Sequence, residues 1–171
     1  MPLPLAHGLL GATIVAAARP RAAGRQSALP LLAGALLANA ADFDFGLVFA
    51  LHSRAWHRGF THSLAFALLV CALFLFGLGL RRARAAAGYG LAYASHALLD
   101  FATTKVGGGV ELFWPFSSER LGLGWRGLSE LPSRLMPAEI FKALCLELAL
   151  FAPLLAAVLW LGRAAPRKRD S

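Results

Sequence analysis

The chain has 171 residues, of which 58% are apolar and only 15% charged, and its formal net charge is +8. Soluble domains carry about 25% charged residues. A chain this short cannot bury so much apolar surface in water, so we exclude a soluble globular protein. Nucleic-acid binding, a common role for basic chains, is also disfavoured, because the arginines lie between and after the apolar runs, as topogenic charges do.

Apolar segments predict about five transmembrane helices, each near the 17–25 residues that a span needs. They are Leu3–Ala18, Ala28–Leu51, Leu64–Leu80, Ala85–Thr104 and Ile140–Gly162. We therefore expect residues 1–162 to form one all-α domain, a polytopic membrane helical bundle. Aspartates and histidines interrupt the second and fourth segments, and ionisable groups at membrane depth are costly and usually functional.

Basic residues predict the orientation of the bundle. They form clusters after the first, third and fifth segments, at residues 19–25, 81–84 and 163–169. With five spans these clusters fall on one side, which the positive-inside rule makes cytoplasmic. The N-terminus is then outside, the C-terminus is inside, and residues 163–171 form a basic cytoplasmic tail.

The longest connection runs from Lys105 to Pro137 and contains several glycines and prolines together with Trp114 and Trp125. Tryptophan is enriched at the level of the lipid headgroups. We expect residues 105–139 to form a partly ordered outer loop that lies on the bilayer surface.

In the fourth segment His96 and Asp100 are four residues apart, so they share one face of the predicted helix. Tyr89 and Tyr93 extend the same stripe. A polar stripe on an apolar helix indicates a site inside the bundle. The alternative is a structural His–Asp hydrogen bond between helices, and this pair alone does not decide between them.

Two histidines, His57 and His62, are separated by a run that contains Arg58 and Gly59. They can converge if Gly59 interrupts the backbone and the third helix begins near Thr61 as its N-cap. The guanidinium of Arg58 suits a phosphate oxygen. A purely interfacial or topogenic arginine is an equally good interpretation.

Asp42 and Asp44 lie two residues apart in an apolar stretch. An α-helix would place them on different faces, so both can serve one site only if the helix is broken or ends here. Carboxylates in lipid require cations. Metal ions would meet that need, and a salt bridge to Arg54 or Arg58 is the alternative.

His7 lies in the outer half of the first helix, where Gly8 and Ala12 indicate close packing on a neighbouring helix. By itself it is more typical of a hydrogen bond between helices. The predicted topology, however, brings it to the same membrane face as the other ionisable residues. The combined set of candidate metal ligands is His7, Asp42, Asp44, His57, His62, His96 and Asp100.

Imidazoles and carboxylates without thiolates suit a catalytic zinc, manganese or iron site better than a structural zinc site. Seven candidate ligands exceed the needs of one tetrahedral ion. We expect two or more divalent ions, with Zn²⁺ favoured, in an arrangement that activates water and binds a phosphoryl group.

Several of these runs resemble the YdjM-like family of inner-membrane metal-dependent hydrolases, over roughly residues 5–120. The runs are 57–63 (His-Arg-Gly-Phe-Thr-His-Ser), 95–100 (Ser-His-Ala-Leu-Leu-Asp) and 113–116 (Phe-Trp-Pro-Phe), with His7 and the Asp-Phe-Asp run 42–44. The family often has a proline where this chain has Ala41. The resemblance, and the family's similarity to zinc-dependent phospholipases C and P1-type nucleases, implies a zinc cluster on a helical bundle and hydrolysis of a phosphodiester or phospholipid.

We therefore expect a multi-pass protein of a bacterial inner membrane that hydrolyses a lipid or lipid-linked phosphoester at its outer face. Asp44 or Asp100 would orient or deprotonate the attacking water, and Arg58 would bind a phosphate oxygen. The alternatives are a metal-ion or proton transporter and a structural membrane protein with a degenerate site.

Overall fold

The computed structural model describes residues 2–19, 27–104, 108–125 and 136–164, and the described residues form helices with one isolated antiparallel bridge between Val110 and Leu121. The predicted all-α class is confirmed. The α-helices are α1 Pro4–Ala18, α2 Leu29–Asn39, α3 Phe45–Leu51, α4 Leu64–Leu78, α5 Ala83–Thr103 and α6 Pro137–Ala164. The short 3-10 helices are η1 Ala40–Asp44, η2 Arg54–Trp56, η3 Phe60–His62 and η4 Leu80–Arg82.

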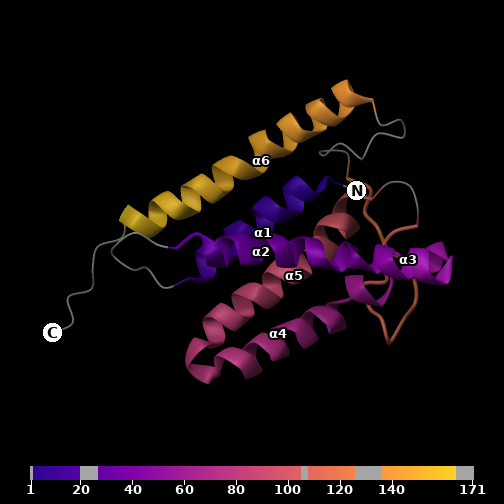
Figure 1. Ribbon diagram of the computed structural model, residues 1–171, viewed down its shortest axis with the longest axis horizontal. Coiled ribbons are helices and arrows are strands. Elements are labelled where there is room, and N and C mark those ends of the chain that lie inside the picture. Colours follow the sequence, from indigo (N-terminus) through magenta and orange to yellow (C-terminus); the bar gives the residue numbers. More distant parts are fainter. Residues whose placement is uncertain (1, 20–26, 105–107, 126–135, 165–171) are drawn as a thin grey trace.

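Helix α5 is the centre of the bundle and contacts α1, α2 and α4. The long helices run along one common direction, with α4 on one side of α5 and α6 on the far side of α1 (Figure 1). Helix α3 continues from α2 and projects beyond the end of the bundle (Figure 1). Among the described elements, α6 joins the bundle mainly through α1.

Two described helical stretches are long and apolar enough to cross a membrane, Leu29–Leu51 and Pro137–Arg163. A third candidate span combines Arg54–His62 with Leu64–Leu78, which are bent by 53° relative to each other. Helix α1 is apolar but short, and α5 carries the polar stripe. The structure therefore supports two or three spans, and the number five and the orientation stay predictions.

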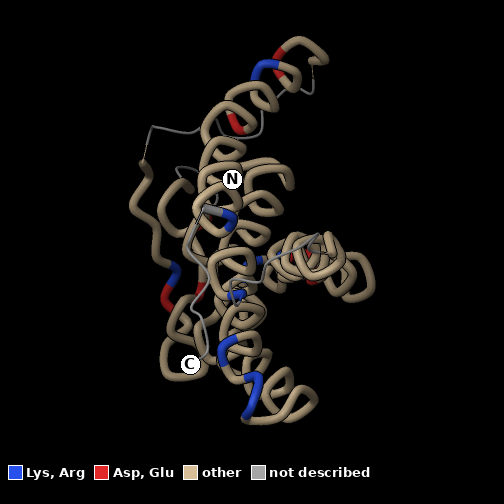
Figure 2. The backbone as a smooth tube through the Cα atoms, turned by 90° about the vertical axis from the view of Figure 1, so that its left-hand side faces the viewer, with Lys and Arg blue, Asp and Glu red and all other residues tan. Residues whose placement is uncertain are grey.

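The distribution of buried and exposed side chains is the reverse of that in a soluble protein. Large apolar side chains such as Phe76 (92% exposed) and Leu68 (71%) face outward, as in a lipid-facing surface. Lysine, arginine, aspartate and glutamate occupy only short stretches of the tube in Figure 2. The largest fully buried side chains are those of His7, His62, His96 and Glu147. The interior of the bundle is thus built from small residues and a few ionisable ones.

Small residues allow the helix backbones to approach closely. A Cβ atom added to Gly11 of α1 would lie 2.5 Å from the Cβ of Ala38, and one added to Gly34 of α2 would lie 2.6 Å from Val15. The same holds for Gly90 of α5 against Cys71 of α4, at 2.5 Å. The expected close packing beside His7 is present, and Gly11 is its tightest point.

Several basic residues lie at the end of the bundle opposite α3. Arg81 and Arg82 are in η4, between α4 and α5, and Arg84 donates a hydrogen bond to the carbonyl of Ala17 at the end of α1 (3.1 Å). The C-terminal end of α6 also lies toward this end (Figure 1). The basic residues at 21, 25 and 167–169, and hence most of the predicted tail, lie outside the described residues.

We expect Gly11→Ala to lower the stability of the purified protein by about 1–3 kcal/mol, because overpacking forces helices apart. Thermal unfolding in detergent measures this change. Gly77→Ala is the control, since nothing lies within 4 Å of the added Cβ. Equal melting temperatures for the two variants would contradict the packing argument.

Candidate metal centre

The break between α2 and α3 brings two carboxylates to one place. Residues Ala40–Asp44 form the 3-10 helix η1, and Asp44 is buried while Asp42 is partly exposed. Successive residues of a 3-10 helix are spaced differently around the axis from those of an α-helix. The predicted interruption of the α-helix is therefore present as 3-10 geometry within the continuous helical stretch Leu29–Leu51, and both carboxylates face His62.

A second break precedes α4. Arg58 has a positive φ of 60°, an uncommon conformation for a residue with a side chain, and Gly59 lies outside the helical region. The predicted N-cap Thr61 is wrong, because Ser63 caps α4 and accepts a hydrogen bond from the backbone N–H of Phe66 (3.1 Å). Thr61 and His62 instead belong to η3. This turn points both side chains into the bundle.

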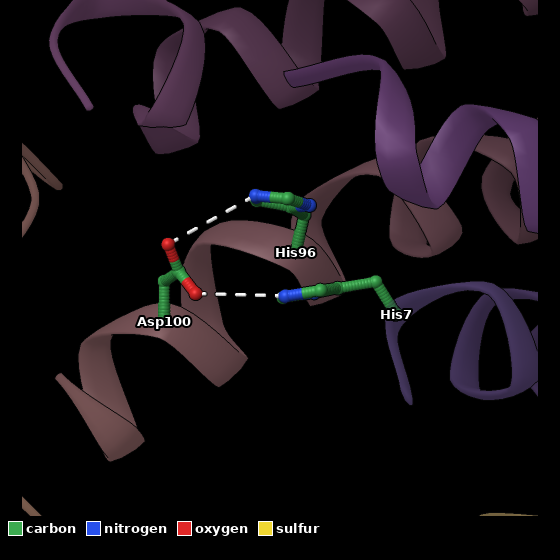
Figure 3. Close-up of side chains that lie close together, drawn as sticks. All are labelled: His7, His96 and Asp100. Atoms are coloured by element: carbon green, nitrogen blue, oxygen red, sulfur yellow. Dashed lines mark ion pairs between the residues drawn. The ribbon is translucent and has the colours of Figure 1, made fainter. Parts of the chain in front are cut away.

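Helices α1 and α5 complete the cluster. Figure 3 shows the rings of His7 and His96 pointing toward the carboxylate of Asp100. The Nε2 of His7 lies 3.5 Å from Oδ1 of Asp100, and the Nε2 of His96 lies 4.0 Å from Oδ2. All three side chains are fully buried.

The four imidazoles form a continuous row. The ring of His57 is 5.8 Å from that of His62, which is 4.8 Å from His96, which stacks on His7 at 3.9 Å. All seven candidate ligands predicted from the sequence thus lie in one cluster. Exposure falls along the row, from 18% for the side chain of His57 to 0% for those of His62, His96 and His7.

Hydrogen bonds to one ring nitrogen leave the other directed at the carboxylates. His96 Nδ1 lies 2.6 Å from the carbonyl of Ala38, which can only accept, so Nδ1 carries a proton and Nε2 faces the carboxylate of Asp42 at 3.3 Å. His62 Nδ1 similarly contacts the hydroxyl of Thr61 at 3.1 Å. Such partners orient metal-binding histidines in proteins.

Many buried polar atoms of the cluster have no hydrogen-bond partner, although such atoms are normally satisfied. They include both nitrogens of His7, Nε2 of His62 and His96, Oδ1 of Asp42, and both carboxylate oxygens of Asp100. A neutral imidazole has one nitrogen with a lone pair, and the Nε2 atoms of His7, His62 and His96 face the carboxylates of Asp42 and Asp100. A divalent cation would satisfy these atoms, so the donor set fits a metal centre.

Three groups of residues place one ligand atom each within 4.8 Å of the others. The innermost group is His7, His96 and Asp100, the middle one is Asp42, His62 and His96, and the outermost one is Asp42, Asp44 and His57. His96 and Asp42 each belong to two groups. Neighbouring ions would therefore share ligands, as in multinuclear centres.

Asp44 differs from Asp42 and Asp100 because both of its carboxylate oxygens have polar partners within the protein. Oδ2 accepts hydrogen bonds from the backbone N–H of Arg58 (2.9 Å) and the hydroxyl of Thr61 (3.0 Å). Oδ1 lies 2.9 Å from Nδ1 of His57. Asp44 thus joins η1 to the segment that carries His57 and His62.

The guanidinium of Arg58 is buried in the cluster. Its Nε lies 3.4 Å from Oδ2 of Asp100. The alternative in which Arg54 or Arg58 forms a salt bridge with Asp42 or Asp44 is wrong within the described residues. The guanidinium of Arg58 pairs with Asp100, and Arg58 contacts Asp44 through its backbone N–H alone. The cluster therefore contains one buried cation of its own.

Only part of the predicted stripe on α5 reaches the site. Tyr93 is buried and its hydroxyl donates to the carbonyl of Thr61 (2.8 Å), which supports η3. Tyr89 instead packs against Phe74 of α4, with ring centroids 4.7 Å apart. The helical spacing was correct, but Tyr89 lies too far along α5 toward its N-terminal end.

The described part of the loop after α5 packs against the segment before α4, and the sequence did not predict this contact. Arg120 donates to the carbonyls of Ala55 (2.8 Å) and His57 (3.1 Å) and pairs with Glu111 (3.1 Å). The N–H of Glu111 donates to the carbonyl of Arg58 (3.0 Å). These bonds fix the segment before α4. The sequence of an irregular loop has no periodicity from which such hydrogen bonds could be predicted.

Glu147 was also not selected from the sequence, although its position in an apolar segment was a sufficient reason to do so. It is the one acidic residue in the apolar segment 140–162. The same argument that selected Asp42 and Asp44 applies to it. It is fully buried on α6, outside the histidine row.

Apolar helices around a buried row of imidazoles and carboxylates define an integral membrane protein with a polar centre. Within this class, the chain belongs to the YdjM inner membrane protein family, whose sequence profile matches residues 1–167. It is 38% identical to the inner membrane protein YbcI of Escherichia coli (strain K12) over 112 residues. That alignment covers 60% of this chain and 62% of the relative. No solved structure matches the chain.

We expect Asp44→Asn and Asp42→Asn to differ in the metal-free protein. Asp44→Asn should cost about 1–3 kcal/mol of stability, because a carboxylate oxygen that accepts hydrogen bonds is replaced by a donor. Asp42→Asn should change stability little, because Oδ1 of Asp42 has no hydrogen-bond partner. Thermal unfolding in detergent with a chelator tests this, and equal destabilisation by both changes would contradict it.

Proposed function

We propose that the protein is a membrane-bound metal-dependent hydrolase that acts on a phosphoester, most readily a lipid or lipid-linked one, at one face of the bacterial inner membrane. The observation that carries the proposal is the convergence of buried imidazole and carboxylate atoms that have no hydrogen-bond partner. Buried carboxylates without partners are expensive. Three adjoining groups that share His96 and Asp42 fit two or three divalent ions, with Zn²⁺ favoured by the ligand types.

Divalent ions held in such a cluster acidify a water molecule and stabilise the charge that develops on a phosphoryl group. The chain's own residues supply the rest. Asp100 suits the water-orienting role better than Asp44, because neither of its oxygens accepts a hydrogen bond, whereas both oxygens of Asp44 have polar partners. Asp44 would act by positioning His57, His62 and the backbone of Arg58.

Arg58 is the proposed phosphate-binding residue. Its side chain is buried beside Asp100, so its charge acts in a low-dielectric environment. A phosphate oxygen would share the guanidinium with Asp100, since one arginine has several donors in a fixed geometry. The left-handed backbone of Arg58 directs its N–H to Asp44 and its side chain to Asp100.

The substrate would approach from the side of Asp42 and His57, the least buried members of the cluster. Phe45 stacks on His57 with ring centroids 4.0 Å apart, and Phe43 and Phe49 are 78% and 75% exposed. Exposed phenylalanine side chains beside a polar site suit contact with the acyl chains of a lipid. This arrangement favours a lipid phosphoester over a freely soluble one.

Transport is less well supported. A path for ions needs polar groups along the length of the bundle. Among the described residues, the buried histidine, arginine and acidic side chains belong to the cluster, apart from Glu147. Toward the opposite end, Gly88 packs on Ala18 and Gly90 on Cys71, with added Cβ atoms 2.6 Å and 2.5 Å away. Close helix packing there favours a site open at one end only.

Elemental analysis of protein purified in detergent without chelator tests metal binding. We expect at least two ions per chain in the wild type and a loss of metal in His62→Ala and Asp100→Ala, because each change removes a ligand. His52→Ala is the control, since His52 is exposed and outside the cluster. Fewer than one ion per wild-type chain would overturn the proposal.

A hydrolysis assay tests the reaction and the function of Arg58. Substrates are bis(p-nitrophenyl) phosphate and phosphatidylglycerol in mixed micelles, and Arg58→Lys should lower kcat/KM about 10- to 100-fold by removing a charge-assisted hydrogen bond. Metal content should not change, because Arg58 is not a ligand. The control is Arg54→Lys, at an exposed position in η2.

Two results would count against the assigned reaction. The first is a fully metal-loaded wild-type protein that cleaves neither substrate. The second is an Arg58→Lys variant with the activity of the wild type, which would remove Arg58 from the phosphate site while leaving the metal centre intact.

A further inference from the structure

Glu147 joins the last helix to the beginning of the first. It lies within α6, its side chain is fully buried, and its two oxygens accept hydrogen bonds from the backbone N–H groups of Leu3 (2.5 Å) and Ala6 (3.0 Å). Its carboxylate therefore contacts the N-terminus of α1 and not the histidine row.

The contact answers a specific need of α1. The first N–H groups of a helix have no partner within the helix, and lipid cannot supply one. The N-cap residue Leu3 has no side chain that can accept a hydrogen bond. The carboxylate of Glu147 satisfies two of these N–H groups and interacts favourably with the positive end of the helix dipole.

The position of Glu147 along α6 places this N-terminus away from the first turn of α6. Helix α6 begins at Pro137. Ten residues of helix correspond to roughly 15 Å at 1.5 Å per residue. Helix α1 therefore begins beside the interior of α6, where Pro2 and Leu3 are buried. Without Glu147, the N–H of Leu3 would be unsatisfied there, and that of Ala6 would keep only its 3.2 Å hydrogen bond to the carbonyl of Leu3.

His7 depends on this anchor more than the other histidines do. Neither of its ring nitrogens has a hydrogen-bond partner, whereas Nδ1 of His57, His62 and His96 contacts Asp44, Thr61 and Ala38. The ring of His7 has only its stacking on His96 and its proximity to Asp100. Its direction is therefore set by the backbone of the first turn of α1, to which Ala6 and Leu3 belong.

We propose that Glu147 is a positioning residue for the metal centre: it holds the first turn of α1 so that His7 completes the innermost group with His96 and Asp100. This inference rests on the proposed metal binding of the cluster. It gives α6, which contributes no candidate ligand among the described residues, a function in the site.

The principal test is Glu147→Gln, with Glu139→Gln as the matched control on an exposed position of the same helix. Glutamine keeps the size but loses the charge and one acceptor. We expect the affinity for one ion to fall about 10- to 100-fold, the usual effect of removing an outer partner of a ligand. The remaining ion or ions should stay bound. Titration of the metal-free protein with Co²⁺, followed by visible absorption, measures each step.

A double-mutant cycle with His7→Ala separates positioning from general stability. If Glu147 acts through His7, Glu147→Gln has no further effect on metal binding in the His7→Ala protein. An equal loss of affinity in both backgrounds overturns the proposal, as does unchanged Co²⁺ binding by Glu147→Gln alone.

Histidine NMR of the metal-free protein keeps this inference distinct from the proposed function. In ¹⁵N-histidine-labelled protein, Glu147→Gln should shift the ring signals of His7 and leave those of His57 in place. If the wild type binds no metal, the proposed function fails. The shift at His7 then still decides whether Glu147 positions it, and an unshifted signal overturns that.

A substitution that removes the hydrogen-bond donor of Leu3 tests the same contact if the Glu147→Gln variant does not fold. Leu3 has φ of −75°, which proline also adopts, so Leu3→Pro removes one N–H without changing the backbone. Leu3→Ala, which removes the same side chain but keeps the N–H, is the control. Leu3→Pro should weaken binding of the same ion, and equal Co²⁺ binding by the two Leu3 variants overturns the proposal.

Discussion

Burial of carboxylates and imidazoles inside an apolar bundle is the constraint on which the rest of this structure depends. Each such group needs a hydrogen bond, an opposite charge or a cation, because neither lipid nor apolar side chains can replace water. The chain meets this need by interrupting its helices. The 3-10 turn at Ala40–Asp44 and the irregular segment before α4 bring side chains from distant parts of the sequence against α5.

The difference in packing between the two ends of the bundle follows from this constraint. Where the helices are unbroken, glycine and alanine bring their backbones together, as at Gly88 and Ala18. Where they are broken, polar side chains fill the space, and Asp44, Tyr93 and Arg120 hold the irregular segments by hydrogen bonds. The regular end stabilises the fold, and the irregular end carries the chemistry that we propose.

Much of the candidate site followed from the sequence, because polar residues stand out in apolar segments. The spacing of His96 and Asp100 placed them on one face, and the Asp42–Asp44 spacing predicted a break in the helix. The position of the next helix start was less accurate. A threonine and a serine are both good N-caps, and the contact of Thr61 with Asp44, which is 17 residues away, decided in favour of Ser63.

The sequence by itself determined that this is a helical membrane protein and which histidines and aspartates gather in its interior, since hydropathy and the cost of buried charge are local properties of the chain. Only the tertiary structure decided how those residues divide their functions. Whether a carboxylate is left without a hydrogen bond, like Asp100, or accepts one from backbone N–H groups, like Asp44 and Glu147, depends on segments far apart in sequence. No local pattern encodes that choice, because it arises from how the helices pack.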